Sequence, residues 1–223
     1  LWRVRRGRLS APAATQNRSV FSVRYGDINL KAIKFSGMYM STTNFEADTL
    51  ETIENGIRLT QKGIDRRLPG FDLPLNKPVP MGTFGTVREA RERWTLPSID
   101  LTLEIRETES GFDLQYRTEG GLDRVPIEIE CTFEGPGEWE TNETLIQVDN
   151  GQTAILKSGL GTFHRGDEGI RIGPGSGVHR TWNMRNSEPD TDSFRVLLTL
   201  QTPVDHILEI RYGTWSLATK DLL

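Results

Sequence analysis

The chain has 223 residues, of which 35% are hydrophobic and 26% charged, and its formal net charge is −4. A chain of this length can bury a core without disulfides or bound metals, and the composition is typical of a water-soluble globular protein. No stretch approaches the ~20 apolar residues of a transmembrane helix, which excludes an integral membrane protein. The acidic balance gives no general attraction to nucleic acid. We therefore expect neither a nucleic-acid nor a membrane partner.

The first residues differ from the rest of the chain. The basic run at residues 2–8 begins after Leu1 rather than Met, and no apolar signal-peptide core follows it. We expect residues 1–18 to form a leader or linker segment, or else an edge strand, that arrives from an upstream domain. No internal repeat or low-complexity run divides residues 19–223, which predicts one β-sandwich domain there. The compartment stays open, and a secreted or periplasmic location is compatible with a large core that lacks disulfides.

Alternation of apolar and polar residues with a period of two is the dominant pattern. Residues 101–107 place Leu101, Leu103 and Ile105 on one face, and residues 111–117 repeat the alternation after a turn at Gly111. These two runs predict a β-hairpin. Similar runs predict strands at 19–25, 28–35, 37–42, 49–54, 56–61, 125–133, 138–141, 144–148, 153–158, 160–165, 169–172, 177–184, 194–202 and 205–212.

Glycine, asparagine and aspartate turns separate these short runs at the close spacing of an all-β protein. The fold class that follows is all-β, with a large antiparallel β-sandwich of the supersandwich or jelly-roll type, one domain and little helix. Residues 68–80 break the pattern because four of the 11 prolines lie there, and we expect a long surface loop. In residues 86–94, Val87, Ala90 and Trp94 have helical spacing, while a strand with charged flanks fits equally well. Helix and strand both remain open there.

Cys131 is the single cysteine of the chain. It falls on the apolar face of the alternating run at residues 127–133. A small buried hydrophobe fits this position better than a reactive thiol. We therefore expect Cys131 to be buried and unreactive.

A glycine-rich stretch at residues 159–183 contains the best candidates for chemistry. His164 and His179 lie there, each followed by an arginine, and a strand–turn–strand arrangement would bring them together. One histidine could act as a base while Arg180 holds a carboxylate. Ordinary strand positions between tight glycine turns explain the same residues. A metal needs at least three ligands; with two in view, we predict no metal centre and no cofactor.

Part of this stretch resembles the second cupin motif. Pro174, His179 and Asn183 match its spacing, but the glycine is displaced to Gly177 and the first cupin motif is missing. A metal-dependent cupin with this sequence would lack most of its ligands.

A wider resemblance in layout involves residues 20–27, 169–175 and 204–210. Their succession resembles the closing β-sandwich of bacterial polysaccharide-degrading proteins, similar to heparinase-type lyases. In that family the sandwich follows an (α/α) helical domain that carries much of the lyase chemistry. The resemblance implies a C-terminal accessory domain whose partners are a polysaccharide or oligosaccharide and an upstream catalytic domain.

The five tryptophans raise the question of sugar binding, since sugar rings stack on flat indoles. Trp139 lies at a predicted loop edge, and Trp182 follows His179 and Arg180. We predict Trp139 and Trp182 as carbohydrate-binding residues, against the alternative that each belongs to the core. Two acid pairs, Glu128 with Glu130 and Glu138 with Glu140, share a strand face, as acids on any solvated strand do.

Three functions remain open. The first is an accessory β-sandwich of a carbohydrate-active protein, which packs against a catalytic domain or holds polysaccharide. The second is a polysaccharide lyase or sugar-modifying enzyme with His179, Arg180 and His164 as catalytic residues. The third is a structural or partner-binding sandwich without a ligand. The enzyme hypothesis requires His164, His179 and an acid to converge in a concave pocket.

Overall fold

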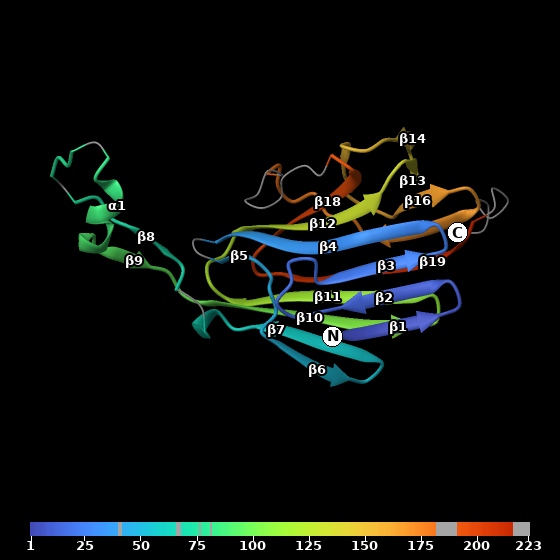
Figure 1. Cartoon of the computed structure of the whole chain (residues 1–223), viewed down its shortest axis with the longest axis horizontal. Helices are drawn as coiled ribbons and strands as arrows, with labels where there is room; N and C mark the ends of the chain where they lie inside the picture. The colour runs from blue at the N-terminus through green and yellow to red at the C-terminus, as the bar shows by residue number, and fades with distance from the viewer. Residues whose placement is uncertain (40–41, 66–67, 76, 81, 182–190, 216–223) are drawn as a thin grey trace.

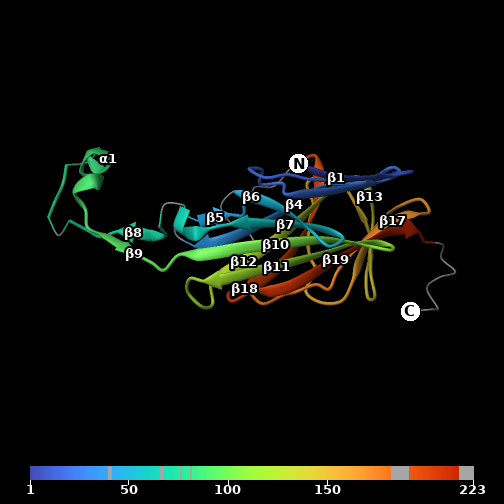
Figure 2. The same ribbon diagram turned by 90° about the horizontal axis from the view of Figure 1, so that it is seen from below.

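The computed structural model describes residues 1–39, 42–65, 68–75, 77–80, 82–181 and 191–215, and these form two large sheets packed face to face (Figures 1 and 2). Among the described residues, the eight-stranded sheet has the order β1-β2-β3-β4-β12-β18-β15, with β5 beside β4. Its strands are β1 (Trp2–Arg6), β2 (Leu9–Ala13), β3 (Phe21–Tyr25), β4 (Ile28–Tyr39), β5 (Thr42–Asn44), β12 (Pro126–Glu134), β15 (Thr153–Ile155) and β18 (Ser193–Gln201).

The second sheet has nine strands within the same described ranges, in the order β14-β13-β16-β17-β19-β11-β10-β7-β6. They are β6 (Thr49–Ile53), β7 (Gly56–Gln61), β10 (Ile99–Thr108), β11 (Gly111–Gly120), β13 (Gly137–Thr141), β14 (Leu145–Val148), β16 (Gly161–Arg165), β17 (Glu168–Gly173) and β19 (Asp205–Thr214). The predicted all-β sandwich is confirmed. The predicted hairpin is β10–β11, with continuous antiparallel pairing from Ile99 with Gly120 to Thr108 with Gly111.

The core lies between the two sheets and consists of the alternate residues that the period-two pattern places on their inner faces. At one end Phe35 stacks on Tyr116, with ring centroids 4.5 Å apart. At the other end Phe133 stacks on Phe163 at 4.8 Å. Cys131 is also buried in this core, as predicted. Its burial raises the pKa of the thiol.

The first residues do not form a separate leader. β1 and β2 make an antiparallel hairpin, and β2 pairs with β3, so this segment belongs to the eight-stranded sheet. Val4, Leu9 and Ala11 contribute to the core. Of the two alternatives for residues 1–18, the separate leader is corrected and the edge strand is present, because β1 forms the edge of this sheet. Small alanines on the inner face and Pro12 within β2 give a weak strand signal, although the alternation is present.

The proline-rich segment is not simply a loop. It contains β8 (Gly70–Asp72), which pairs with β9 (Arg93–Thr95) in a two-stranded sheet of its own. Between them lie the short helix α1 (Phe84–Val87) and the 3-10 turn η2 (Arg88–Ala90). Both alternatives for residues 86–94 are therefore partly right. We call residues 68–75, 77–80 and 82–97 the arm, which projects from one end of the sandwich (Figures 1 and 2).

Candidate functional site

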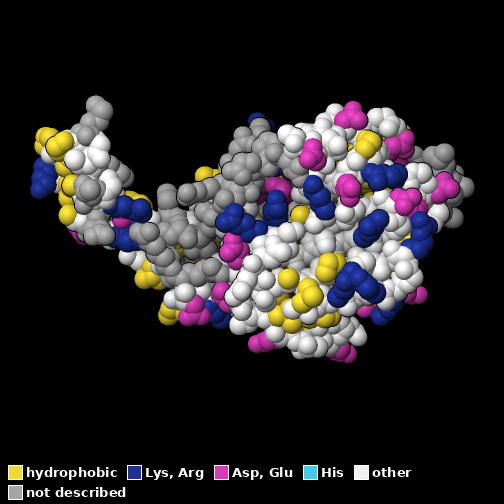
Figure 3. Space-filling view, viewed as in Figure 1, with side chains coloured by type: hydrophobic (Ala, Val, Ile, Leu, Met, Phe, Trp, Pro, Cys, Tyr) yellow, Lys and Arg dark blue, Asp and Glu magenta, His cyan; other side chains and the backbone are white. Residues whose placement is uncertain are grey.

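The outer faces of the two sheets differ in what they offer to a ligand. On the eight-stranded sheet the central outward side chains are buried, including Glu128 at 1% exposure and Glu130 at 2%. Glu130 is bonded by Lys34 at 3.0 Å, Thr132 at 3.1 Å and Arg195 at 3.2 Å. Glu130 thus lies in a buried charge network, and neither acid belongs to a solvated strand face. Figure 3 shows this side of the molecule, where acidic and basic side chains are interspersed.

The outer face of the nine-stranded sheet carries the candidate site, at the neighbouring strands β13, β16, β17 and β19. Along β16, Phe163 points into the core, so its neighbours Thr162 and His164 point outward. Glu140 of β13 points outward on the same argument, because Trp139 is buried. The His164 Nε2 and Glu140 Oε2 atoms are 3.1 Å apart.

Trp215 follows β19 and lies over the same surface. Its backbone N–H donates to the backbone carbonyl of Asp167 at 2.8 Å. Its ring is perpendicular to the His164 imidazole, with centroids 6.2 Å apart and an interplanar angle of 89°. A side chain at Gly169 would meet the indole at 2.6 Å, so this glycine leaves the space that the ring occupies.

Arg171 of β17 completes the cluster. Its guanidinium carbon lies 5.1 Å from the centre of the Trp215 ring, a cation–π arrangement. Its Nε donates to Thr162 Oγ1 at 3.1 Å. The two terminal nitrogens of Arg171 remain as donors on the sheet surface. We call Glu140, Thr162, His164, Arg171 and Trp215 the Trp215 cluster.

Burial dominates the electrostatics of His164 and lowers the pKa of its imidazole, although the Glu140 carboxylate acts in the opposite direction. The imidazole is therefore neutral at pH 7. Because Glu140 can only accept a hydrogen bond when ionised, we assign the imidazole proton to Nε2. This leaves Nδ1 as an acceptor for a ligand hydroxyl.

His179 does not join His164. It belongs to a segment bridged to β18 by Gly177 and Thr199, in the eight-stranded sheet. Its Nε2 bonds the carbonyl of Ile127 at 2.9 Å, and its Nδ1 accepts from the N–H of Thr181 at 3.2 Å. Both ring nitrogens of His179 are thus hydrogen-bonded to backbone groups. This is a structural role, and it leaves no nitrogen for a cupin-like metal.

Arg180 is exposed, and none of the described residues pairs with it. His164 and His179 lie in different sheets, so the predicted catalytic set of His179, Arg180 and His164 does not converge. The enzyme hypothesis for these residues required His164, His179 and an acid to converge in one pocket, and the two histidines do not. Within the described part of the chain, no group of three or more His, Cys, Asp or Glu side chains could hold a metal.

Trp139 is corrected from a sugar platform to a core residue. Its exposure is 3%, and its ring packs against Phe133 and Phe194 with centroids 6.3 and 5.7 Å apart. Gly161 lies directly beneath the indole, and a side chain there would clash with it. Trp182, the other predicted sugar-binding residue, lies outside the described residues.

The residues that sequence reasoning missed are Trp215, Arg171 and the pairing of Glu140 with His164. The available signal was two glycines, Gly169 and Gly213, at paired outward positions on β17 and β19. Glycine at such positions marks a close approach by another group. Here that group is the indole of Trp215, two residues after Gly213.

No helix among the described residues is long and apolar enough to cross a membrane. No protein-family model matches the chain, and no curated protein matches it. A solved structure of a galactose mutarotase-like protein from Lactobacillus casei ATCC 334 is similar over 95% of this chain and 99% of that chain, at 7% sequence identity and a TM-score of 0.43. The β-sandwich that the resemblance to heparinase-type lyases implies is present. A relationship to that family stays a prediction.

Proposed function

We propose that this chain is a carbohydrate-binding β-sandwich, accessory to a catalytic domain, and that the Trp215 cluster holds one sugar ring. The observation that carries the proposal is an indole placed on the outer face of a sheet beside four polar side chains. Trp215 has Arg171 within cation–π distance and His164 at its edge. Sugar sites combine an aromatic platform with a few polar groups in this way.

The chemistry of the cluster suits hydroxyl groups. The apolar face of a pyranose stacks on the indole, while the terminal nitrogens of Arg171 donate to ring oxygens or hydroxyls. Glu140 and the Nδ1 atom of His164 accept from hydroxyls. Glu138 also points outward from β13 and is held by Gln147 at 2.5 Å. The two acids against one arginine favour neutral sugars over polyanionic ones.

The test is a calorimetric titration of neutral and uronic-acid oligosaccharides into the wild type and Trp215→Ala. Stacking on an indole is worth ~1 kcal/mol or more, so the substitution should weaken binding at least several-fold. Trp94→Ala is the matched control, because Trp94 is an exposed tryptophan on the distant arm. Sugar binding that survives Trp215→Ala unchanged would place the site elsewhere.

A second function rests on the His164–Glu140 pair. A neutral imidazole oriented by a carboxylate can take a proton from a sugar, as a lyase or sugar-modifying enzyme requires. Under this hypothesis His164→Gln abolishes product formation, while sugar binding weakens only in part because Trp215 and Arg171 remain. Incubation of the wild type with the bound glycan and chromatography of the products distinguishes the two functions. An intact glycan favours the accessory domain.

A further inference from the structure

The arm is a separate structural unit with few means of stabilising itself. β8 and β9 pair over three residues each, from Gly70 with Thr95 to Asp72 with Arg93, and this sheet is separate from the two large ones. Both views show the arm extending beyond the end of the sandwich (Figures 1 and 2). An isolated two-stranded hairpin is marginally stable at best in water. The arm therefore needs another surface to pack against.

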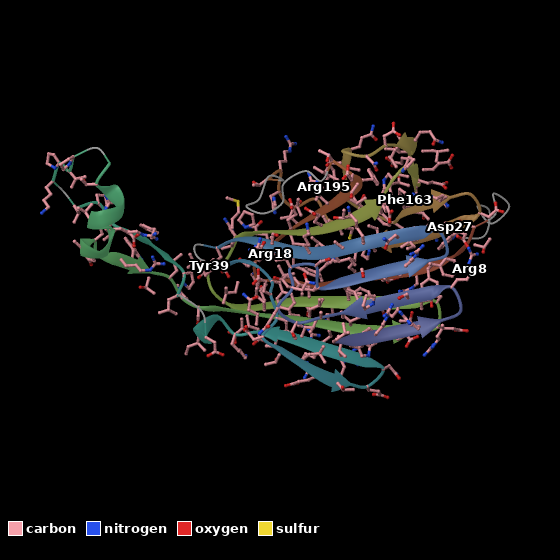
Figure 4. All side chains as sticks on the ribbon, viewed as in Figure 1. Arg8, Arg18, Asp27, Tyr39, Phe163 and Arg195 are labelled. Carbon is pink, nitrogen blue, oxygen red and sulfur yellow. The ribbon has the colours of Figure 1, made fainter. Side chains whose placement is uncertain are left out.

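Specific polar contacts nevertheless give the arm a defined shape. Asp72 accepts hydrogen bonds from Arg88 at 2.8 Å and Arg93 at 3.3 Å, and the bond from Arg88 is the main cause of the lowered pKa of this carboxyl. At its base, the Tyr39 hydroxyl donates to the carbonyl of Pro97 at 2.6 Å (Figure 4). The arm is thus organised before it meets a partner.

Exposed apolar side chains gather on the arm and at the end of the sandwich from which it leaves. Phe71 and Trp94 are 42% and 58% exposed, and their rings stack with centroids 5.8 Å apart. These two residues are the arm patch. Met38 near the end of β4, Ile64 shortly after β7 and Leu122 shortly after β11 are also exposed, and we call these three residues the end patch. Hydrophobic side chains are visible on the arm in Figure 3. Clustered exposed apolar surface marks an interaction site.

The two patches lie in surroundings of opposite charge. The arm carries Lys77, Arg88, Arg91 and Arg93 against Asp72, Glu89 and Glu92, which gives 4 − 3 = +1. Near Ile64 of the end patch, the acids Asp48, Asp65, Asp100 and Glu119 surround Lys62, and Asp48 accepts a hydrogen bond from its backbone N–H at 3.3 Å. Lys62 marks the centre of these acids, since Asp100 bonds its ammonium at 2.7 Å and raises its pKa, with further contributions from Glu119 and Asp65.

We propose that two copies of this chain associate head to head, with each arm packed on the end patch of the other copy. An arm that points away from its own sandwich cannot cover its own end patch, but it can cover that of a copy related by a two-fold axis. Such an interface uses the same pair of surfaces twice, as symmetric dimers do. It buries Phe71 and Trp94 and brings a basic arm to an acidic end.

Sedimentation velocity over a range of concentrations tests the proposal. We expect a dimer for the wild type and a rise in its dissociation constant of about tenfold or more for Trp94→Ser, because buried aromatic residues dominate such interfaces. Ile207→Ser is the matched control, since Ile207 is an exposed apolar residue on the nine-stranded sheet. Circular dichroism checks that each variant is folded. A wild type that stays monomeric at the highest concentration overturns the proposal.

Mixing two variants separates reciprocal docking from other modes of association. Phe71→Ser/Trp94→Ser removes the arm patch, and Leu122→Ser/Asp123→Lys alters the end patch. Each variant alone loses both arm–end contacts of the dimer. In a mixture, the intact arm of the second variant meets the intact end patch of the first, so one contact is restored. We expect heterodimers that are tighter than either homodimer. Equal affinities for all three pairings would contradict the proposed geometry.

Discussion

Trp139 and Trp215 carry the same side chain in the same sheet, yet their environments are opposite. Trp139 points inward from β13 and packs against Phe133 and Phe194. Trp215 lies on the outer face, over Gly169. The difference follows from strand parity and from glycines that make room on one face or the other. For a tryptophan, the face of the sheet decides between a core role and a ligand role.

Trp139→Ala should therefore reduce stability rather than sugar binding. Removal of a large buried aromatic side chain costs about 3–5 kcal/mol because a cavity remains in the core. Urea unfolding of the wild type and of Trp139→Ala measures the difference. Ile207→Ala, at an exposed isoleucine outside the proposed interface, should change the unfolding free energy by less than about 0.5 kcal/mol. An equally small change for Trp139→Ala would argue against its place in the core.

At the scale of elements, the β1–β2 hairpin extends the eight-stranded sheet at one edge and covers part of the core. Val4 and Leu9 are buried, and the Trp2 ring meets Phe112 of the opposite sheet, with centroids 6.4 Å apart. At the end of this hairpin, Arg8 forms an ion pair with Glu168 of the other sheet. The hairpin therefore links the two sheets as well as lengthening one.

Deletion of residues 1–13 should destabilise the protein by several kcal/mol, because burial of each large apolar side chain contributes about 1.5–3 kcal/mol. Thermal unfolding followed by circular dichroism measures the effect. An unchanged melting temperature on removal of 1–13 would support the leader that the sequence predicted.

Elements with strong alternation, such as β10 and β11, were predictable because each half-buried face appears directly in the sequence. β4 was predicted as two strands because Gly37 resembles a break. In the structure the strand continues through Gly37, where a side chain would meet Ile127 at 2.9 Å. Gly37 leaves room there for the end of the Ile127 side chain on β12 and does not mark a turn. Such information lies in the partner strand and not in the local sequence.

The candidate site was predictable only in part for the same reason. His164 was found from its own strand, whereas Glu140 lies 24 residues earlier and Trp215 follows a different strand. The order β13-β16-β17-β19 brings them together. Likewise, Glu128 and Glu130 have the pattern of a solvated face, and long-range packing buries them. Period-two patterns predict which face a residue takes, but not what covers that face.

At the scale of the whole molecule, two histidines of the nine-stranded sheet couple folding to pH. Burial lowers the pKa of His164 and of His206 below the ordinary value of 6.5. The charge of Glu140, which also accepts a hydrogen bond from His164, opposes the effect of burial at His164, and the Pro174 carbonyl, which accepts a hydrogen bond from His206, opposes it at His206. The His206 Nε2 atom is buried without a hydrogen-bond partner among the described residues. Protonation of either imidazole is therefore easier in the unfolded chain.

The sign of the pH effect follows from this difference. Above pH ~6.5 both states hold neutral imidazoles, and the full stability is present. As the pH falls below 6.5, the unfolded chain takes up protons first, so the unfolding free energy decreases down to the lowered pKa of the folded state. Urea unfolding between pH about 7.5 and about 5.5 should show this loss. In His206→Asn, which keeps a donor for Pro174 and cannot titrate, the loss should be smaller. A slope that is unchanged in His206→Asn would assign the pH dependence to His164 or to carboxylates, and His164→Gln then separates these two.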